Sequence, residues 1–280
     1  MLNKPSQYQK VIEANIRYHE ALAPTYDSNQ PHYKPENLAR IEQILANMAA
    51  ETGGNSLLDL GCGTGFIINI AKKYFRRVVG VDITPGMLER VDKTGGHIEL
   101  YQADTGDIPL GANEFDVCTA YGFLHHLYDL RPTLTEAYRC LRPGGLFFSD
   151  QDPNYHYWSL MDSLKQRNDL EGIVQREVKS VVSVDEDIAE ESGLNSEDVA
   201  LAEFQKVTKG GFNADEILGL MQEIGFQSSE AQYEWFLGQG KVLHQQSKGD
   251  AEIIETFLRE ALPASRHLFK YISFFAKKNI

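Results

Sequence analysis

Residues 57–65 read Leu57-Leu58-Asp59-Leu60-Gly61-Cys62-Gly63-Thr64-Gly65, and this stretch decides the fold. A short, mainly apolar run leads directly into three alternating glycines, and a helical pattern of apolar residues follows. Such a run is typical of a buried strand, and the glycines let the chain turn sharply and let a ligand approach the backbone. The stretch therefore predicts a strand, a ligand-binding loop and a helix, as in open α/β sheets.

The same alternation of strand and helix continues on the C-terminal side of the loop. Apolar runs separated by helical patterns predict five strands, at residues 57–60, 78–81, 98–102, 115–120 and 146–149. Further strands are expected at residues 227–237 and 271–276. Because strands and helices alternate, we expect an α/β fold with a doubly wound, mostly parallel, seven-stranded sheet.

Four segments are predicted along the chain. Residues 1–50 should form N-terminal helices that cover the site, and residues 51–151 a cofactor-binding core. Residues 152–211 break the rhythm and are expected to be a helical cap that builds a substrate pocket. Their acidic stretch at 185–198 is interpreted as a solvated face or a lid segment. Residues 212–280 should complete the core sheet and carry a helical insert.

Charge and composition restrict the partners. The 280 residues carry a formal net charge of −13, which repels a phosphate backbone, so no nucleic acid is expected as a partner. The three cysteines lack the spacing of a disulfide framework or a zinc site. No segment resembles a signal peptide or reaches 18 apolar residues, so we expect a cytoplasmic location and no membrane span. The oligomeric state stays open, with a homodimer as one option.

Three acidic residues lie at or next to the ends of predicted strands. The glycine pattern G-x-G-x-G follows Asp59, an acid that would repel a pyrophosphate but suits a ligand with a cationic amino group and a sulfonium. Asp82 ends the second strand, where an acid can accept hydrogen bonds from both ribose hydroxyls; the alternative is a role in the turn that follows. Asp104 follows the third strand and can receive an adenine amino group, or can act in a local turn.

These motifs resemble those of class I S-adenosylmethionine-dependent methyltransferases, in particular the group similar to the ubiquinone and menaquinone C-methyltransferases. Residues 58–65 resemble the first motif of the family, and residues 121–127, Tyr-Gly-Phe-Leu-His-His-Leu, resemble the segment after its fourth strand. Leu141-Arg142-Pro143-Gly144-Gly145 resembles the lead-in to its fifth strand, and Tyr26-Asp27 a pair that closes over the cofactor. The resemblance covers about residues 18–150.

This resemblance implies S-adenosyl-L-methionine as the cofactor and a Rossmann-like methyltransferase fold whose last strand is antiparallel. Ile83 and Met87 are expected to be apolar walls for the adenine, and Cys62 a small buried residue beside the cofactor. The predicted cofactor-binding residues are Tyr26, Asp59, Gly61, Cys62, Gly63, Gly65, Asp82, Ile83, Met87, Asp104, Thr105 and Tyr121.

Two histidines and four aromatic residues are predicted to act on the acceptor. His125 and His126 follow the fourth strand, where one of them could be a general base; the alternative is that they pack the loop. Substrate contacts are predicted from Tyr33, Tyr155, Tyr157 and Trp158, although the last three could simply anchor the cap.

No metal is predicted. Asp150, Asp152 and Asn154 could suggest a cation site, but their order around a proline is also that of a turn.

The function expected from these features is methylation of a small-molecule acceptor on oxygen, nitrogen or carbon. Three alternatives stay open: a methyltransferase-like fold that uses the cofactor for a different reaction, a binding protein without catalysis, and methylation of tRNA or protein. An acidic surface argues against RNA.

Overall fold

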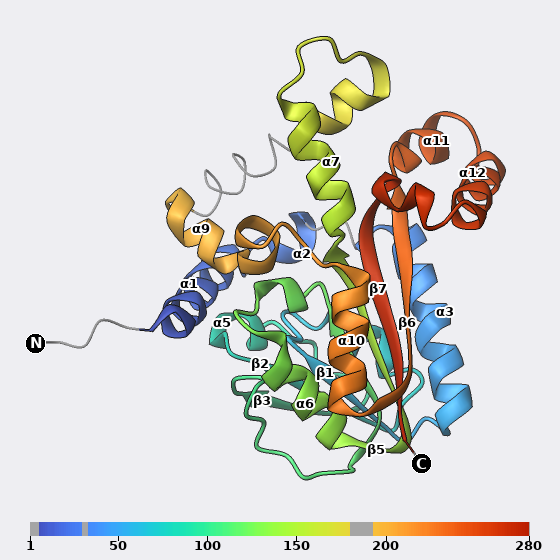
Figure 1. The fold of residues 1–280 in the computed structure, drawn as a ribbon. Coiled ribbons are helices and arrows are strands. Elements are labelled where there is room, and N and C mark those ends of the chain that lie inside the picture. Colours follow the sequence, from blue (N-terminus) through green and yellow to red (C-terminus); the bar gives the residue numbers. More distant parts are fainter. Residues whose placement is uncertain (1–5, 30–32, 180–192, 280) are drawn as a thin grey trace, which may run out of the picture.

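A computed structural model describes residues 6–29, 33–179 and 193–279 and places seven strands in one sheet (Figure 1). The strand order is β3-β2-β1-β4-β5-β7-β6. Strands β1 to β5 pair in parallel, whereas β7 is antiparallel to both β5 and β6. The strands are β1 Ser56–Leu60, β2 Arg77–Asp82, β3 His97–Gln102, β4 Phe115–Tyr121, β5 Leu141–Pro153, β6 Phe226–Phe236 and β7 Phe269–Lys278. The predicted fold class and the antiparallel last strand are confirmed.

Successive residues of the strands enter two separate hydrophobic cores. Leu57 of β1 packs into one core and Leu58 into the other, and Phe147 and Phe148 of β5 divide in the same way. Side chains of a strand alternate between the two faces of a sheet. Because both faces are covered by helices, the central strands are apolar at most positions, which explains their largely continuous hydrophobic runs.

Helices cover the two faces of the sheet (Figure 1). Residues of α3 (Pro35–Thr52) and α4 (Phe66–Ala71) pack into the core that contains Leu57, and residues of α6 (Leu130–Cys140) and α10 (Ala214–Ile224) into the core that contains Leu58. A short helix, α5 (Pro85–Leu88), follows β2, and the 3-10 turn η2 (Leu124–His126) follows β4.

The remaining helices lie around the carboxyl ends of the parallel strands (Figure 1). Between β5 and α10 the chain forms α7 (Tyr155–Lys165), a helical segment at 172–179, α9 (Ser196–Ala202) and the π-helical turn η3 (Phe204–Thr208). The N-terminal helix α1 (Gln7–Leu22) contacts α9, and Arg17 forms an ion pair with Asp198. Residues 185–192 of the acidic stretch lie outside the described residues.

Several predicted boundaries differ from the observed ones. The short helix α2 (Tyr26–Asn29) follows α1 in the N-terminal segment. The fifth strand begins at Leu141 rather than at residue 146, because Leu141 pairs with Phe115 before a shift of register lets Leu146 pair with Val117. The Pro-Gly-Gly sequence thus lies within the strand as an irregularity. The insert between β6 and β7 contains two helices, α11 (Gln239–Gln245) and α12 (Lys248–Glu260), followed by the 3-10 turn η4 (Ala264–Leu268).

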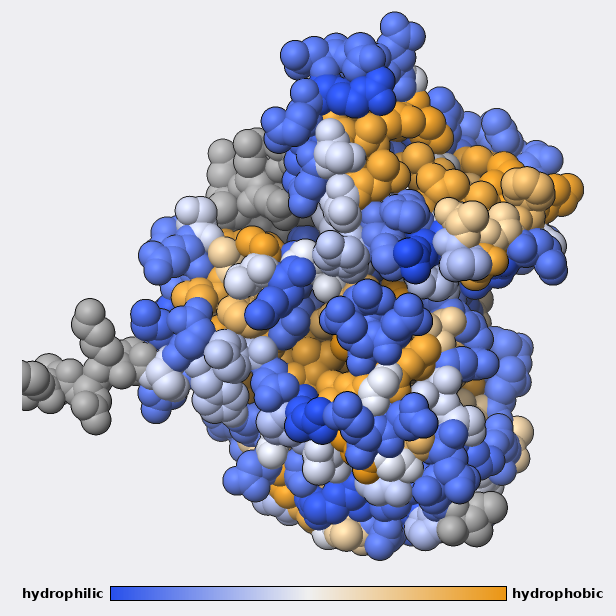
Figure 2. Space-filling view, in the orientation of Figure 1, coloured by the Kyte–Doolittle hydropathy of each residue, from blue (hydrophilic) through white to orange (hydrophobic). Residues whose placement is uncertain are grey.

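The surface is hydrophilic over most of the face seen in Figure 2, but hydrophobic residues gather near α7 and the α11–α12 insert. On α12, Ile253 and Phe257 are each 70% exposed. Among the described residues, no helix combines the length and the apolar character needed to cross a bilayer.

Candidate active site

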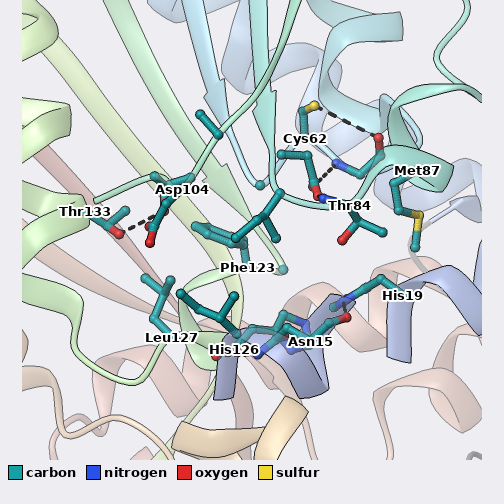
Figure 3. A pocket seen from close by; sticks show the side chains of 18 of the residues that line it. Asn15, His19, Cys62, Thr84, Met87, Asp104, Phe123, His126, Leu127 and Thr133 are labelled. Carbon is teal, nitrogen blue, oxygen red and sulfur yellow. Dashed lines mark hydrogen bonds between the residues drawn. The ribbon is translucent and has the colours of Figure 1, made fainter. Parts of the chain in front are cut away.

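A pocket lies beneath α1 at the carboxyl edge of the sheet. The space enclosed is about 1080 Å³, part of it open to solvent. One side is formed by the ends of β1, β2, β3 and β4 with their following loops, and the other by Val11, Asn15 and His19 of α1. In Figure 3, Asp104 and Thr133 lie at one end, Cys62, Thr84 and Met87 at the other, and Asn15, His19 and His126 face them across Phe123. Parallel topology thus brings residues far apart in sequence to one edge of the sheet.

Most of the predicted cofactor residues line this pocket. Eleven of the twelve do so: Tyr26, Asp59, Gly61, Cys62, Gly63, Asp82, Ile83, Met87, Asp104, Thr105 and Tyr121. Thr64, which was not predicted, also lines the pocket. Gly65 instead begins α4 with φ 92°, and a Cβ atom there would lie 3.0 Å from Val91. Glycine at this position therefore lets α4 start close to the side chain of Val91.

Asp82 holds the glycine loop in place. Its carboxylate accepts hydrogen bonds from the backbone N–H of Gly63 at 2.9 Å and of Thr84 at 2.8 Å. Asp82 therefore has the predicted role in the turn. A carboxylate offers about four acceptor positions, so these two hydrogen bonds leave positions that a ligand can use. The same side chain lines the pocket and can accept further hydrogen bonds from a ligand.

Asp104 combines a local turn with a contact to α1. It accepts a hydrogen bond from the N–H of Gly106 at 2.8 Å, and the hydroxyl of Tyr8 donates to its second oxygen. Burial and the bond to this carboxylate raise the pKa of Tyr8 to about 12, so the phenol remains a donor. The N-terminal helix is thereby attached to the pocket at the end where adenine was predicted.

Two glycines of the loop have conformations that a larger residue would not tolerate. Gly61 has φ 65°, and a Cβ atom there would lie 2.0 Å from the ring of Phe123. Gly63 has φ 51°, and a Cβ atom there would meet nothing within 4 Å. The loop is therefore closely packed at Gly61 and open toward the pocket at Gly63, which leaves room for a ligand against the backbone.

Asp59 and Cys62 are both buried beneath the loop. Asp59 accepts a hydrogen bond from the hydroxyl of Thr119 at 2.8 Å. Burial raises the pKa of this carboxyl to about 8, a rise that the Thr119 bond opposes and the charge of Asp82 supports. A cationic ligand group nearby would favour the ionised form. Burial likewise raises the pKa of the Cys62 thiol well above its usual range, so that thiol is protonated at neutral pH.

N-terminal helices were expected to cover the site, but the residues of α1 that line the pocket were not predicted from the sequence. Asn15 donates through its amide nitrogen to the carbonyls of Val11 at 2.9 Å and His126 at 3.1 Å. These two bonds fix the amide, and its oxygen, which is buried, has no hydrogen-bond partner among the described residues. A buried carbonyl without a donor is unfavourable, so this oxygen is available to a ligand. The only signal in the sequence was the spacing of Val11, Asn15 and His19 along one helical face.

The two histidines after β4 occupy different positions. His126 lines the pocket, and its Nδ1 lies 2.8 Å from the carbonyl oxygen of Ala202. Because that oxygen can only accept, Nδ1 carries the proton and Nε2 carries the lone pair. His125 stacks behind it with ring centroids 4.1 Å apart, and its Nδ1 lies 3.0 Å from Asp152 Oδ1. Burial, followed by the charge of His125, lowers the pKa of His126 to about 4, so the imidazole is neutral at physiological pH.

The four predicted substrate residues are not brought together. Tyr33 lies behind the glycine loop, where its hydroxyl is 3.0 Å from that of Thr64. Tyr155 is 42% exposed, whereas Tyr157 and Trp158 pack into a small core with the segment at 172–179. Consecutive residues of a helix point in directions about 100° apart, so the run on α7 cannot line one surface. Of these residues, Tyr157 lines a second cavity, and its predicted substrate contact remains a prediction.

The residues that suggested a cation site are engaged by the protein. Asp150 forms an ion pair with Arg40, Asp152 contacts His125, and Asn154 caps α7. Another cluster, His125, His126 and Glu203, has potential ligand atoms within 4.8 Å of one another. The ammonium of Lys206 lies 3.6 Å from Glu203 and neutralises it, so we propose no metal there.

Comparisons with known proteins show the family of this chain. The family described as a methyltransferase domain matches residues 58–149. The chain is 30% identical over 218 residues to the 27-O-demethylrifamycin SV methyltransferase of Amycolatopsis mediterranei, covering 72% of this chain and 77% of that protein. It is 28% identical over 129 residues to a probable S-adenosylmethionine-dependent methyltransferase of Mycolicibacterium smegmatis, covering 45% and 50%. The chain spans about half the length of the first curated relatives it matches.

Solved structures show the same fold. The phosphoethanolamine N-methyltransferase 2 of Haemonchus contortus, in complex with S-adenosyl-L-methionine, superimposes with a TM-score of 0.59 at 14% identity over 99% of this chain and 61% of that one. A Bacillus subtilis protein, YcgJ, superimposes with a TM-score of 0.52 at 15% identity over 86% and 99%. The chain therefore belongs to the S-adenosylmethionine-dependent methyltransferases, as the sequence motifs predicted.

The pocket residues fit that cofactor. The open side of Gly63 leaves space against the backbone, Asp82 has unused acceptor positions, and the buried Asn15 oxygen has no donor. Asp59 offers a negative charge to a cationic group, and Met87 and Ile83 offer apolar contacts. We propose that these residues hold S-adenosyl-L-methionine.

Proposed function

We propose that this chain transfers the methyl group of S-adenosyl-L-methionine to a nucleophilic atom of a small-molecule acceptor. The observation that carries the proposal is the pocket at the strand ends, where Asp59, Asp82 and Asp104 surround an open glycine loop beneath α1. A site covered by a helix favours a small acceptor over a folded macromolecule. The net charge of −13 also argues against nucleic acid.

The protein's part in the reaction is to orient the acceptor, exclude water and accept a proton. When bound, S-adenosyl-L-methionine supplies a methyl group already activated by its sulfonium. The helix α1 excludes water by covering the pocket, and its attachment through Tyr8 and Asp104 keeps it there. If the acceptor attacks through a hydroxyl or a protonated amine, the neutral Nε2 of His126 is the atom we propose as the general base.

The hydrogen bonds of the two histidine rings support this assignment. His126 is held by the Ala202 carbonyl, and His125 by Asp152, so each ring has one fixed nitrogen and one free lone pair. Only His126 of the two lines the pocket as described. We therefore place His126 at the acceptor and give His125 and Asp152 a positioning role.

The proposal is tested by following the methyl group. Purified protein is incubated with S-adenosyl-L-methionine carrying a labelled methyl group and an extract of small metabolites, and labelled products are identified by mass spectrometry. We expect a product heavier by one labelled methyl group, together with S-adenosylhomocysteine. Binding of S-adenosylhomocysteine without any labelled product would support a binding protein instead, and the absence of binding would overturn the assignment altogether.

Asp59 makes the affinity for the cofactor depend on pH. The pKa of this carboxyl is about 8, so it is mainly protonated at pH 6. A cationic amino group binds the carboxylate, so binding below pH 8 must first release a proton. We expect the affinity for S-adenosylhomocysteine to fall from pH 8 to pH 6, by up to about tenfold per pH unit.

Calorimetric titration in buffers of different ionisation enthalpy measures both the affinity and the protons released. The Asp59→Asn variant cannot titrate at this position, and its affinity should be nearly constant over the same range. A wild-type affinity that does not change between pH 6 and pH 8 would show that Asp59 does not face the cationic group.

A further inference from the structure

A second cavity lies beside the cofactor pocket at the same edge of the sheet. It is formed by the N-terminus of α3, by α7 and by the ends of β5, β6 and β7, and it encloses about 880 Å³, part of it open to solvent. Its walls include Lys34, Gln151, Tyr157, Trp235, Lys270 and Tyr271. Several of these side chains are aromatic, which suits a planar ligand.

Two residues of this cavity have an unusual backbone conformation. Gln151 has φ 62° and Trp235 has φ 59°, and the only other described residue with positive φ apart from the glycines is Asn113. Asparagine tolerates this region, whereas glutamine and tryptophan rarely adopt it. Backbone strain of this kind is often found at ligand sites, where it directs side chains to positions that regular structure does not reach.

Tyr157 brings a phenol to the wall of the cavity. The residue is only 1% exposed and lines the cavity between α7 and the strand ends. Burial raises the pKa of this phenol, so it stays a hydrogen-bond donor. A phenol in the wall of the cavity can donate a hydrogen bond to an acceptor group of a ligand.

The charges around the cavity favour an anion. Neither Lys34 nor Lys270 forms an ion pair with a carboxylate among the described residues, and Lys34 begins the 18-residue helix α3 without a side-chain cap. The acids of the cavity are partly occupied: Glu36 lies 3.7 Å from His244, and Glu177 lies 3.4 Å from Arg176. The exposed Lys34, the N-terminus of α3, and Lys270, whose ammonium lies 5.3 Å from the ring centroid of Tyr271, thus line the same cavity.

One hydrogen bond separates this cavity from the cofactor pocket. The amide of Asn37, which lines the second cavity, donates to the hydroxyl of Tyr121, which lines the first, at 2.8 Å. Arg40 donates to the other side of the same amide at 3.1 Å and so fixes its orientation. A ligand in the second cavity would therefore lie beside the part of the cofactor pocket that contains Tyr121, and methyl transfer requires the acceptor and the cofactor to come together there.

We infer that this second cavity binds the body of the methyl acceptor, and that the acceptor is a planar aromatic molecule carrying a carboxylate or a phenolate. The inference rests on the proposed function, and the reacting group would be directed past Asn37 and Tyr121 toward the cofactor. In the reaction the acceptor's oxygen or nitrogen bonds to the methyl carbon as the carbon–sulfur bond breaks. The sulfur keeps the electron pair in S-adenosylhomocysteine, and the acceptor's proton passes to His126.

The test uses 2-naphthoate as an anionic aromatic probe and 2-naphthalenemethanol as its uncharged counterpart. Each is titrated by calorimetry into the full chain saturated with S-adenosylhomocysteine, whose own binding is measured first. We expect the naphthoate to bind at least roughly tenfold more tightly than the alcohol, because a charged hydrogen bond is lost with the alcohol. Lys270→Met should weaken naphthoate binding by about tenfold, and Tyr157→Phe by about threefold.

Lys277→Met is the matched control, because Lys277 lies on the same strand but pairs with Glu51 away from the cavity. It should leave naphthoate binding unchanged. The inference is overturned if naphthoate fails to bind, binds no better than the alcohol, is displaced by S-adenosylhomocysteine, or is unaffected by Lys270→Met. If S-adenosylhomocysteine itself does not bind, the proposed function is wrong. If S-adenosylhomocysteine binds and naphthoate does not, only the inference about the second cavity is wrong.

Discussion

Asp82→Ala is expected to weaken binding of S-adenosylhomocysteine by roughly 100- to 1,000-fold. The carboxylate has two tasks, since it accepts the backbone N–H groups of Gly63 and Thr84 and also lines the cofactor pocket. Alanine would remove the bonds to the ligand and would also release the glycine loop from its observed conformation. Hydrogen bonds to a charged group contribute about 1.5–3 kcal/mol each, so two of them near the lower end of that range, about 3–4 kcal/mol together, account for the expected loss.

Calorimetric titration measures the affinity, and circular dichroism establishes that the variant is folded. Asp82→Asn keeps the shape and one acceptor oxygen, so its affinity should fall between those of wild type and Asp82→Ala. Asp92→Asn is the matched control, because Asp92 lies on the surface beside Lys72 and outside the pocket. An Asp82→Ala protein that is folded and binds as tightly as wild type would contradict the proposed cofactor site.

His126→Ala is expected to lower kcat by about 100- to 10,000-fold for an acceptor that must lose a proton, with a much smaller change in the affinity for S-adenosylhomocysteine. The neutral ring offers Nε2 to the pocket, whereas Nδ1 is fixed by the Ala202 carbonyl. Its pKa of about 4 means that the base is already unprotonated at pH 6, so wild-type activity should not depend on this group between pH 6 and pH 8.

Single-turnover kinetics with the acceptor found in the labelling experiment separate the chemical step from product release. His97→Ala is the control, because His97 is an exposed residue of β3 away from the pocket. Asp152→Asn should have a smaller effect than His126→Ala, since Asp152 acts through the orientation of His125. A His126→Ala enzyme with a kcat within about threefold of wild type would show that no base is needed or that another residue supplies it.

The three acidic residues of the pocket could be predicted because each of them lies at or next to the end of a strand. Asp82 follows a run of apolar residues, and in a parallel sheet every such end lies at the same edge. The sequence therefore predicted which edge carries the site and which residues meet there. The hydrogen bond from Gly63 to Asp82 could not be predicted, since it depends on the pairing of β1 with β2.

The residues that contact the acceptor were harder to predict. The prediction depends on the directions in which side chains point and on contacts between residues far apart in the sequence. The aromatic run on α7 was assigned to one substrate surface, but consecutive helical residues diverge, and Tyr155 is exposed while Tyr157 is buried. Asn15 of α1 contacts the backbone of His126, which is 111 residues away in the chain. No periodic pattern within α1 contains information about that partner.

The sequence by itself determined the order of strands and helices, the glycine loop and the three carboxylates beside it, because these follow from hydrophobic periodicity and from the conformations that glycine permits. The structure was needed to learn which residues of α1 line the pocket, that His126 rather than His125 lines it, and that a second cavity adjoins it through Asn37. These features depend on how helices pack across the ends of the strands, and such packing is set by contacts between residues distant in sequence.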